Sequence, residues 1–354
     1  MTDITDHSGI ISAILAEWGD YSPLVEPEIF GTGDPGQIAR SIAEFCSIVP
    51  GSAIAKCLFY RVSQGSVFGL HLKDGRRIVL KVHPPKQPRD FLAAVYHIQC
   101  HLADHSFPCP KPIAGPVSLV HGHATVEELV DVGNYADAHD PAIRRTMAET
   151  LFRLVDLTRD FTSMPGLQSS ILSRQPGDAL WPTPHSKIFD FEATKVGSEW
   201  IDQIASKARQ ALSNSAGKKV IGHTDWSVKH FRFEGSKARV IYDWDSLALE
   251  KEPVIVGDAA RGFTMTWYLD VPLAPSYDEF WAFVSEYEAA RGRAFTSAER
   301  TTIAASAAYA LAYSARCENC LDPGAKDFPA GSFREALAHY GEKLVSAGII
   351  LSSS

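Results

Sequence analysis

The stretch that decides the fold is residues 220–245, VIGHTDWSVKHFRFEGSKARVIYDWD. Its β-like runs are Val220–Asp225, Phe231–Phe233 and Ala238–Trp244, the last two joined by a Glu-Gly-Ser turn. Asp225 and Asp243 each end an apolar run, 18 positions apart (243 − 225). An aspartate at a strand end can equally cap a turn or present its carboxylate to a site, so neither residue is decisive alone.

The two aspartates together are a more specific signal, because neighbouring short strands deliver both carboxylates to one place. Phosphoryl transfer needs a carboxylate that orients the attacking hydroxyl and cations that neutralise the phosphates. Asp225 fits the first need as a general base. Asp243 fits the second, since Mg²⁺ prefers hard oxygen ligands.

The N-terminal half of the chain has the pattern of an antiparallel sheet with helices. Asp74-Gly75 lies between two β-rich runs and predicts a hairpin. The predicted strands are Ile54–Val62, Val67–Lys73, Arg76–His83, Gly115–Val120 and His123–Leu129. The predicted helices of this half are Gln37–Val49 and Asp90–His105.

Two features of this sheet are candidates for phosphate binding. Lys81 lies among apolar residues on the third strand, where it is either an edge-strand surface lysine or a side chain that reaches a ligand. The bend Ser63-Gln64-Gly65-Ser66 either covers phosphates with backbone N–H groups or is an ordinary hairpin turn.

The rest of the chain is mainly helical, with amphipathic runs at Ala142–Phe161 and Glu192–Leu212. Three capping boxes predict helix starts, at Ser276…Glu279, Thr296…Glu299 and Ser332…Glu335. The order predicts an α+β fold with two lobes, and a cleft between lobes is a favoured ligand site. We expect an N-terminal lobe at 1–126, a hinge at 127–133, and a helical C-terminal lobe at 134–354 whose catalytic hairpin spans 220–245.

Composition and charge argue against several classes of function. The 34 basic and 42 acidic residues give a net charge of −8, which argues against a nucleic-acid partner. No apolar stretch approaches membrane-spanning length, and the acidic start Met1–Asp6 lacks a signal-peptide layout, so we expect a cytoplasmic protein. Cys317 and Cys320 have the spacing of metal ligands, but no second Cys/His pair with such a spacing stands out. Packing of the two cysteines within a helix is therefore favoured.

These motifs, in this order, resemble the aminoglycoside phosphotransferase and choline kinase-like superfamily, which has a protein-kinase-like fold. The family pattern is His-Gly-Asp, an Asn five residues on, a hairpin, then Ile-Asp-Trp; here the matching positions are His223-Thr-Asp225, His230 and Ile241-Tyr-Asp243-Trp244. The resemblance implies ATP and Mg²⁺ as cofactors. It makes Asp225 the catalytic base, Asp243 a magnesium ligand and Lys81 the phosphate-binding lysine. It also makes Glu127, Glu128 and Leu129 part of an adenine-binding hinge.

The sequence departs from the family pattern at two important positions. His230 stands where the family has its metal-binding Asn, and three roles are open to it: metal ligand, phosphate contact or packing. The helix residue that pairs with the lysine in the family is a Glu, and its place falls near Val95 here, with Gln99 one turn further on. The carboxylate partner of Lys81 is therefore missing or displaced.

The segment after Asp243 is short, which favours a small-molecule acceptor over a protein substrate. Six acidic residues are candidates for a pocket that suits a cationic acceptor such as an aminoglycoside, an amino sugar or a choline-like alcohol. They are Asp245, Glu250, Glu252, Asp258, Glu318 and Asp322. The alternative is a catalytically weak or inactive kinase-fold protein that binds a nucleotide or another ligand.

Overall fold

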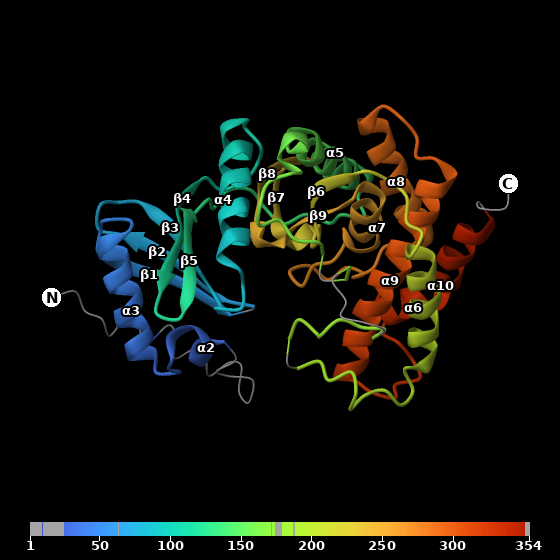
Figure 1. Ribbon diagram of the computed structural model, residues 1–354, viewed down its shortest axis with the longest axis horizontal. Coiled ribbons are helices and arrows are strands. Elements are labelled where there is room, and N and C mark those ends of the chain that lie inside the picture. The colour runs from blue at the N-terminus through green and yellow to red at the C-terminus, as the bar shows by residue number, and fades with distance from the viewer. Residues whose placement is uncertain are drawn as a thin grey trace. The chain divides into compact units, whose positions relative to one another are not determined.

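The computed structural model describes residues 9, 25–62, 64–170, 172–173, 179–186 and 188–350, with the backbone alone for 347–350. The chain divides into two compact units, which are described separately (Figure 1). The N-terminal unit comprises Met1–Asp131 and Met164–Leu167, and the C-terminal unit comprises Val132–Ser163 and Gln168–Ser354.

The N-terminal unit is built on a five-stranded antiparallel sheet in the order β1-β2-β3-β5-β4. Its elements are α2 (Glu26–Phe30), α3 (Pro35–Ile48), β1 (Ile54–Val62), β2 (Ser66–Leu72), β3 (Arg77–His83), α4 (Arg89–Asp104), β4 (Pro112–Leu119) and β5 (Gly122–Glu128). Buried apolar side chains of α2 and α3 join those of the sheet in one core. Because burial of each large side chain contributes about 1.5–3 kcal/mol, this core fixes the strand register.

Register places the central strand β3 between β2 and β5 (Figure 1). Lys81 lies opposite Val67 on one side and Thr125 on the other. Side chains two residues apart on a strand share a face, so Lys81 has Glu127 as a diagonal neighbour. Helix α4 packs beside β4.

The C-terminal unit is mainly helical, with two small sheets. Its helices are α5 (Pro141–Leu157), α6 (Glu199–Leu212), α7 (Glu252–Gly262), α8 (Tyr277–Arg291), α9 (Ser297–Leu321) and α10 (Phe333–Ile350), with 3₁₀ turns η2 (Arg159–Phe161), η3 (Val228–His230) and η4 (Trp244–Ser246). Its strands are β6 (Lys219–His223), β7 (Phe231–Glu234), β8 (Lys237–Ile241) and β9 (Leu247–Lys251). Strand β6 pairs with β9, and β7 pairs with β8, both antiparallel.

Helix α9 is the centre of this unit, with α6, α7 and α10 packed around it (Figure 1). It is rich in alanine and buried on most of its circumference, as expected of a central helix. Gly257 lets α7 approach closely, since a Cβ there would lie 2.3 Å from the carbonyl oxygen of Ile303 in α9. An alanine at this position would therefore push the two helices apart.

The predicted α+β fold is confirmed, with an antiparallel sheet in the N-terminal part and a mainly helical C-terminal part. Strand β1 has the predicted bounds, and the capping boxes at Ser276 and Thr296 both form. The bounds of several other elements differ by a few residues, and two differences are larger. Helix α6 begins at Glu199 rather than Glu192, because Gly197 has φ +86° and the residues before the helix form turns. Strand β9 was not predicted.

No helix in the described part of the chain is both long and apolar enough to cross a membrane. Cys317 and Cys320 both lie in α9, and neither forms a disulfide. Burial raises the pKa of the Cys317 thiol to about 12, as expected for a cysteine that packs in a core. The predicted packing role therefore agrees with its surroundings.

Candidate active site

Asp225 lies in the loop between β6 and η3 of the C-terminal unit, with its side chain 31% exposed. Its Oδ2 is 2.9 Å from Lys229 Nζ and 2.9 Å from His230 Nε2, and its Oδ1 accepts a 3.0 Å hydrogen bond from Ser227 Oγ. Burial alone would raise the pKa of this carboxyl, but Lys229 and His230 outweigh it and hold the pKa well below its usual range. Asp225 is therefore an ionised carboxylate held by three donors.

His223 lies at the start of this loop and fixes it. The residue is less than 2% exposed. Its Nδ1 accepts a 3.2 Å hydrogen bond from the backbone N–H of Asp225, so Nε2 carries the proton and lies 3.3 Å from the carbonyl oxygen of Tyr242. Burial lowers the pKa of His223, which agrees with this neutral form. A neutral imidazole thus links the loop of Asp225 to the residue before Asp243.

Asp243 follows β8 with φ +70°, a left-handed conformation that is uncommon for residues other than glycine. Its Oδ2 accepts a 2.7 Å hydrogen bond from Ser246 Oγ. The carbonyl oxygen of Ser246 in turn accepts hydrogen bonds from the N–H (2.9 Å) and Oγ1 (3.0 Å) of Thr224. The loops that carry the two aspartates are therefore bonded to each other, and the unusual backbone of Asp243 is supported by its surroundings.

Asp225, His230 and Asp243 are the one group of potential metal ligands found among the described residues, with ligand atoms within 4.8 Å of one another. His230 Nε2 lies 3.9 Å from Asp243 Oδ2. Two carboxylates fit Mg²⁺, but the imidazole fits it less well. Because Nε2 pairs with an ionised carboxylate it must carry a proton, and it can ligate a metal only after losing it.

Lys81 of the N-terminal unit has a carboxylate partner, which comes from a strand rather than from a helix. Its Nζ lies 3.7 Å from Glu127 Oε1, and both side chains are nearly buried. Glu127 Oε2 accepts a 2.9 Å hydrogen bond from Gln99 Nε2 of α4, and this amide also donates to the carbonyl oxygen of Pro110 at 2.9 Å. The partner of Lys81 is thus displaced to β5, and α4 contributes an amide.

A family model described as the phosphotransferase enzyme family matches residues 63–295, which are 233 of the 354 residues (295 − 63 + 1). The chain belongs to the phosphotransferase enzyme family. The predicted resemblance and enzyme class are thereby confirmed: the protein is a small-molecule kinase that phosphorylates a hydroxyl group. A comparison with curated proteins found no match.

Solved structures of similar fold include kinases of small molecules. An amicoumacin kinase in complex with AMP-PNP and Ca²⁺ has a TM-score of 0.61 at 11% identity, covering 87% of this chain and 93% of that one. A macrolide 2′-phosphotransferase from Brachybacterium faecium has a TM-score of 0.51 at 13% identity, with coverages of 87% and 96%. A putative aminoglycoside phosphotransferase from Ralstonia eutropha has a TM-score of 0.50 at 16% identity, with coverages of 89% and 98%. At these identities the likeness shows a shared fold.

Within this phosphotransferase, the described residues of the predicted bend lie before β2 and at its start. Ser63 lies outside the described residues, and Gln64 and Gly65 form the bend itself. Ser66 belongs to β2, and its buried hydroxyl is 3.1 Å from Tyr60 Oη. Only the backbone of Ser66, and not its side chain, is thus left as a candidate for phosphate binding.

Two of the three predicted hinge residues belong to a strand. Glu127 and Glu128 belong to β5. The N–H of Glu128 donates to the carbonyl oxygen of Lys111 at 2.9 Å, and that of Leu129 donates to Arg77 at 3.0 Å. Both N–H groups therefore already have acceptors in the N-terminal unit, and the role of this segment in binding a base stays a prediction.

Sequence reasoning missed three side chains that bond the carboxylates of this phosphotransferase: Ser227, Lys229 and Ser246. Lys229 is the most informative of them, because it pairs with Asp225 from four residues away. The spacing was visible in the sequence, but the direction of the side chain depends on the 3₁₀ turn η3. Without that turn, a lysine next to a histidine reads as an ordinary surface residue.

The six acidic residues considered for an acceptor pocket do not form one cluster of unpaired charge. Several instead pair with arginines inside the C-terminal unit: Glu252 with Arg291 (2.7 Å), Asp258 with Arg261 (2.9 Å), and Asp322 with Arg334 (3.5 Å). Glu318 accepts backbone N–H bonds at the start of α10. Internal pairing of this kind explains their presence without any ligand.

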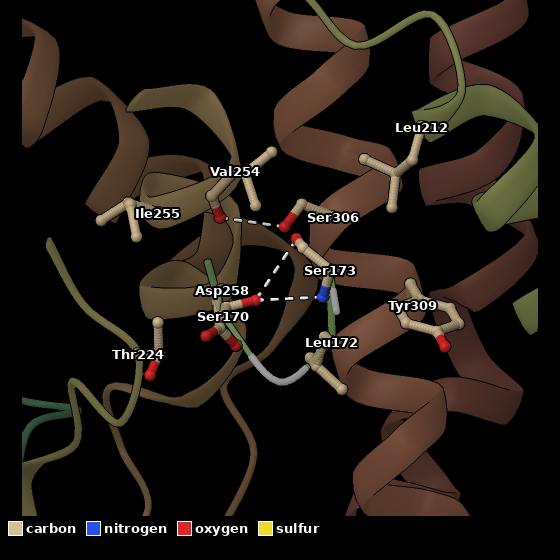
Figure 2. Close-up of a pocket in the computed structure, with 10 residues that line it drawn as sticks. All are labelled: Ser170, Leu172, Ser173, Leu212, Thr224, Val254, Ile255, Asp258, Ser306 and Tyr309. Atoms are coloured by element: carbon tan, nitrogen blue, oxygen red, sulfur yellow. Dashed lines mark hydrogen bonds between the residues drawn. The ribbon is translucent and has the colours of Figure 1, made fainter. Parts of the chain in front are cut away.

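A small pocket of the C-terminal unit includes Thr224, the neighbour of Asp225 (Figure 2). Its lining residues are Ser170, Leu172, Ser173, Leu212, Thr224, Val254, Ile255, Asp258, Ser306 and Tyr309. Ser306 Oγ donates to the carbonyl oxygen of Val254 at 2.9 Å, and the hydroxyls of Ser170 and Ser173 bond each other at 3.3 Å (Figure 2). Because these polar groups already have partners in the protein, we assign no ligand to this pocket.

Proposed function

We propose that this protein transfers the γ-phosphoryl group of ATP, with Mg²⁺, to a hydroxyl group of a small molecule, and that Asp225 orients that hydroxyl. One observation carries the proposal: the ionised carboxylate of Asp225 is held by Lys229, His230 and Ser227 within reach of a second carboxylate, Asp243. Such a fixed pair of carboxylates is what phosphoryl transfer requires of a protein.

In the proposed reaction the acceptor oxygen forms a bond to the γ-phosphorus, and the bond from that phosphorus to the bridging oxygen of ADP breaks. The hydroxyl proton passes to Asp225 and from there to solvent, so the products are ADP and the phosphorylated acceptor. A carboxylate with a strongly lowered pKa is a weak base. Asp225 therefore acts mainly by orientation, and it receives the proton late in the transfer.

The metal would be held mainly by Asp243. Its Oδ2 is bonded to Ser246, which orients the carboxylate, and Mg²⁺ needs only one or two carboxylates besides phosphate oxygens and water. Mg²⁺ would supply charge neutralisation at the phosphates. His230 Nε2 is hydrogen-bonded to Asp225 at 2.9 Å, so the first role of His230 would be to hold Asp225.

The nucleotide would be held by the N-terminal unit. Lys81, oriented by Glu127, would contact phosphates, and the backbone of Gln64, Gly65 and Ser66 would cover them. The amicoumacin kinase of similar fold was solved with AMP-PNP, an ATP analogue, which supports a nucleoside triphosphate as the donor.

The acceptor is proposed only as a small alcohol. Cationic acceptors, such as aminoglycosides, amino sugars and choline-like alcohols, were expected from the six acidic residues. Most of these residues have partners within the protein, and Lys229 adds a positive charge beside Asp225. That charge weakens the case for an acceptor whose cationic group lies next to the reacting hydroxyl.

The experiment is an ADP-release assay against a panel of small alcohols, followed by mass spectrometry of the phosphorylated product. Asp225→Asn should lower kcat by at least about 100-fold with little change in nucleotide affinity, because it removes the orienting carboxylate. Asp278→Asn, at an exposed aspartate in the first turn of helix α8, is the matched control and should keep the wild-type kcat. A wild-type rate in Asp225→Asn would show that another group orients the acceptor.

A second candidate function has one observation in its favour: both Lys229 and His230 already occupy Oδ2 of Asp225. A protein with its base occupied in this way could bind a nucleotide or other ligand without turnover. Nucleotide binding by calorimetry, combined with no phosphorylated product and no ADP from any acceptor or from water, would favour this function over the kinase.

A further inference from the structure

Three aromatic side chains lie exposed together on the C-terminal unit, beside the loop of Asp225. Trp267 is 61% exposed, Tyr268 is 53% exposed and Tyr135 is 39% exposed, and they are the exposed aromatic side chains of the described chain. The rings of Tyr135 and Tyr268 stack with centroids 4.3 Å apart. Large aromatic side chains are rarely left in water without a reason, and a cluster of them marks a binding surface.

This aromatic surface (Tyr135, Trp267 and Tyr268) is tied to the catalytic loop by backbone hydrogen bonds. The N–H of Val228 donates to the carbonyl oxygen of Phe263 at 2.9 Å, and the N–H of Lys229 donates to Met265 at 3.2 Å. On the other side, Asn134 and Phe233 bond each other through both backbone groups at 2.8 Å, which fixes the neighbouring Tyr135. The segments next to the aromatic surface are therefore hydrogen-bonded directly to the loop and hairpin that follow Asp225.

Two cations connect the aromatic surface with Asp225. Lys229 Nζ lies 5.6 Å from the ring centre of Trp267 and 2.9 Å from Asp225 Oδ2, so the ring centre is within 8.5 Å (5.6 + 2.9) of that oxygen. The Arg232 guanidinium lies 3.6 Å from the ring centre of Tyr135, and Arg232 also donates to the carbonyl oxygen of Lys229 at 3.1 Å. The distance from the Trp267 ring centre to Asp225 Oδ2 is thus at most about the width of one sugar ring together with its hydroxyl.

We propose that the aromatic surface is the acceptor platform, on which Trp267 stacks against a ring of the acceptor while a hydroxyl of that ring reaches Asp225. The inference rests on the proposed function and names its substrate class: a ring-bearing alcohol, neutral or anionic, of the sugar or nucleoside kind. A flat indole face beside the reacting carboxylate suits the C–H face of a sugar or the π-face of a base.

The charged side chains around the aromatic surface determine which net charge the acceptor can carry. Lys229 and Arg232 lie close to the aromatic rings, and their positive charges would repel a quaternary ammonium group at the same surface. Neutral hydroxyls and carboxylates, in contrast, can accept hydrogen bonds from both cations. The geometry thus selects for rings and against choline-like acceptors.

A direct test uses protein labelled with 5-fluorotryptophan and ¹⁹F NMR. The resonance of Trp267 is assigned as the one lost in Trp267→Leu. The probes are methyl α-D-glucoside, D-glucuronate and uridine as ring alcohols, and choline and kanamycin as cations. We expect at least one ring alcohol to shift the Trp267 resonance at lower concentration than either cation. No shift with any probe, or a stronger response to choline or kanamycin, would overturn the proposal.

A kinetic test uses the ring alcohol with the strongest NMR response and measures ADP release. Trp267→Leu should raise the KM of this acceptor about tenfold with kcat changed less than threefold, and Trp267→Phe should recover most of the loss. Trp281→Leu is the matched control, because Trp281 also lies beside a cation, Arg300 at 5.7 Å, but on helix α8. An unchanged KM in Trp267→Leu would contradict the platform.

The two tests separate failure of the platform from failure of the proposed function. A shift of the Trp267 resonance without ADP or phosphorylated product would leave a ring-binding surface and refute the kinase reaction. Phosphorylation that depends on Asp225 but not on Trp267 would leave the kinase reaction and refute the platform. Because Trp267 is largely exposed, Trp267→Leu is expected to fold, and its thermal transition checks this.

Discussion

Gln99 Nε2 donates a 2.9 Å hydrogen bond to Glu127 Oε2, while Oε1 of the same carboxylate lies 3.7 Å from Lys81 Nζ. A helix side chain and a strand lysine are thus connected through a carboxylate that belongs to neither element. Since all three side chains are nearly buried, the lysine has little freedom to leave this arrangement. The position of α4 therefore bears on the position of Lys81.

The first prediction concerns this connection. Glu127→Gln removes the charge that holds Lys81, and Gln99→Leu removes the amide that holds Glu127. We expect both variants to raise the KM for ATP, by about tenfold for Glu127→Gln and less for Gln99→Leu, because the lysine is no longer oriented. Steady-state kinetics at saturating acceptor would measure both effects.

The matched control for this prediction is Asp131→Asn. Asp131 also pairs with a basic residue of β3, Arg77 at 3.3 Å, but its side chain is 73% exposed. Exposed ion pairs contribute little, so its KM for ATP should stay at the wild-type value. Equal KM values in Glu127→Gln and Asp131→Asn would mean that Lys81 does not depend on its partner.

The second prediction concerns the metal. His230→Asn replaces an imidazole that is hydrogen-bonded to Asp225 with an amide oxygen, a ligand that suits Mg²⁺ better. We expect the Mg²⁺ concentration for half-maximal rate to fall severalfold. Because Mn²⁺ accepts an imidazole ligand more readily than Mg²⁺ does, we also expect the preference for Mn²⁺ over Mg²⁺ to decrease. A titration of rate against each metal measures both. An unchanged Mg²⁺ dependence would indicate that His230 serves only to hold Asp225.

The third prediction concerns pH and stability. His139 Nδ1 lies 2.8 Å from Glu279 Oε1, and Nε2 lies 3.1 Å from the carbonyl oxygen of Pro272, so both nitrogens donate and the ring is charged. Burial lowers the pKa of His139, but these two acceptors outweigh it and the pKa lies above its usual value. The opposite holds for Glu279, whose pKa is lowered.

A raised histidine pKa gives stability that is present below about pH 6.5, the unfolded value, and is lost as pH rises through the folded pKa. The lowered pKa of Glu279 gives stability that is lost as pH falls through its own folded value. We expect the melting temperature of the wild type to fall between about pH 6 and pH 8 more than that of His139→Gln. His97→Gln, at an exposed histidine, is the control. Parallel pH profiles of wild type and His139→Gln would contradict the charged contact.

The fold was predictable where a local pattern and the core agree. Strand β1 has the predicted bounds, because its β-branched and aromatic residues both favour strands and fill the core. Helix α6 was predicted seven residues too long, because Glu192–Ser198 has a helical composition. There Asp190 accepts backbone N–H bonds from Glu192 and Ala193 and stabilises a turn instead. Local hydrogen bonding of this kind is invisible to periodicity.

The site was predictable in its aspartates but not in their partners. Asp225 and Asp243 end apolar runs, and a strand-end position can be read from sequence. Glu127 could not be recognised as the partner of Lys81, because their contact depends on the pairing of β3 with β5 across a long connection. The register, once known, makes the two diagonal neighbours.

The last prediction concerns Glu252, an acidic residue first considered for acceptor binding. Its Oε2 lies 2.7 Å from Arg291 and its Oε1 accepts a 3.0 Å hydrogen bond from Tyr287, with the carboxylate almost fully buried. Glu252→Gln would leave Arg291 buried without its nearest carboxylate and should lower the free energy of unfolding by about 3 kcal/mol. Glu342→Gln breaks an exposed pair with Lys207 and should cost less than about 1 kcal/mol. Urea denaturation of both variants measures the difference in the free energy of unfolding. If Glu252→Gln lost no more stability than Glu342→Gln and also raised the KM for the acceptor, Glu252 would again be a candidate for acceptor binding.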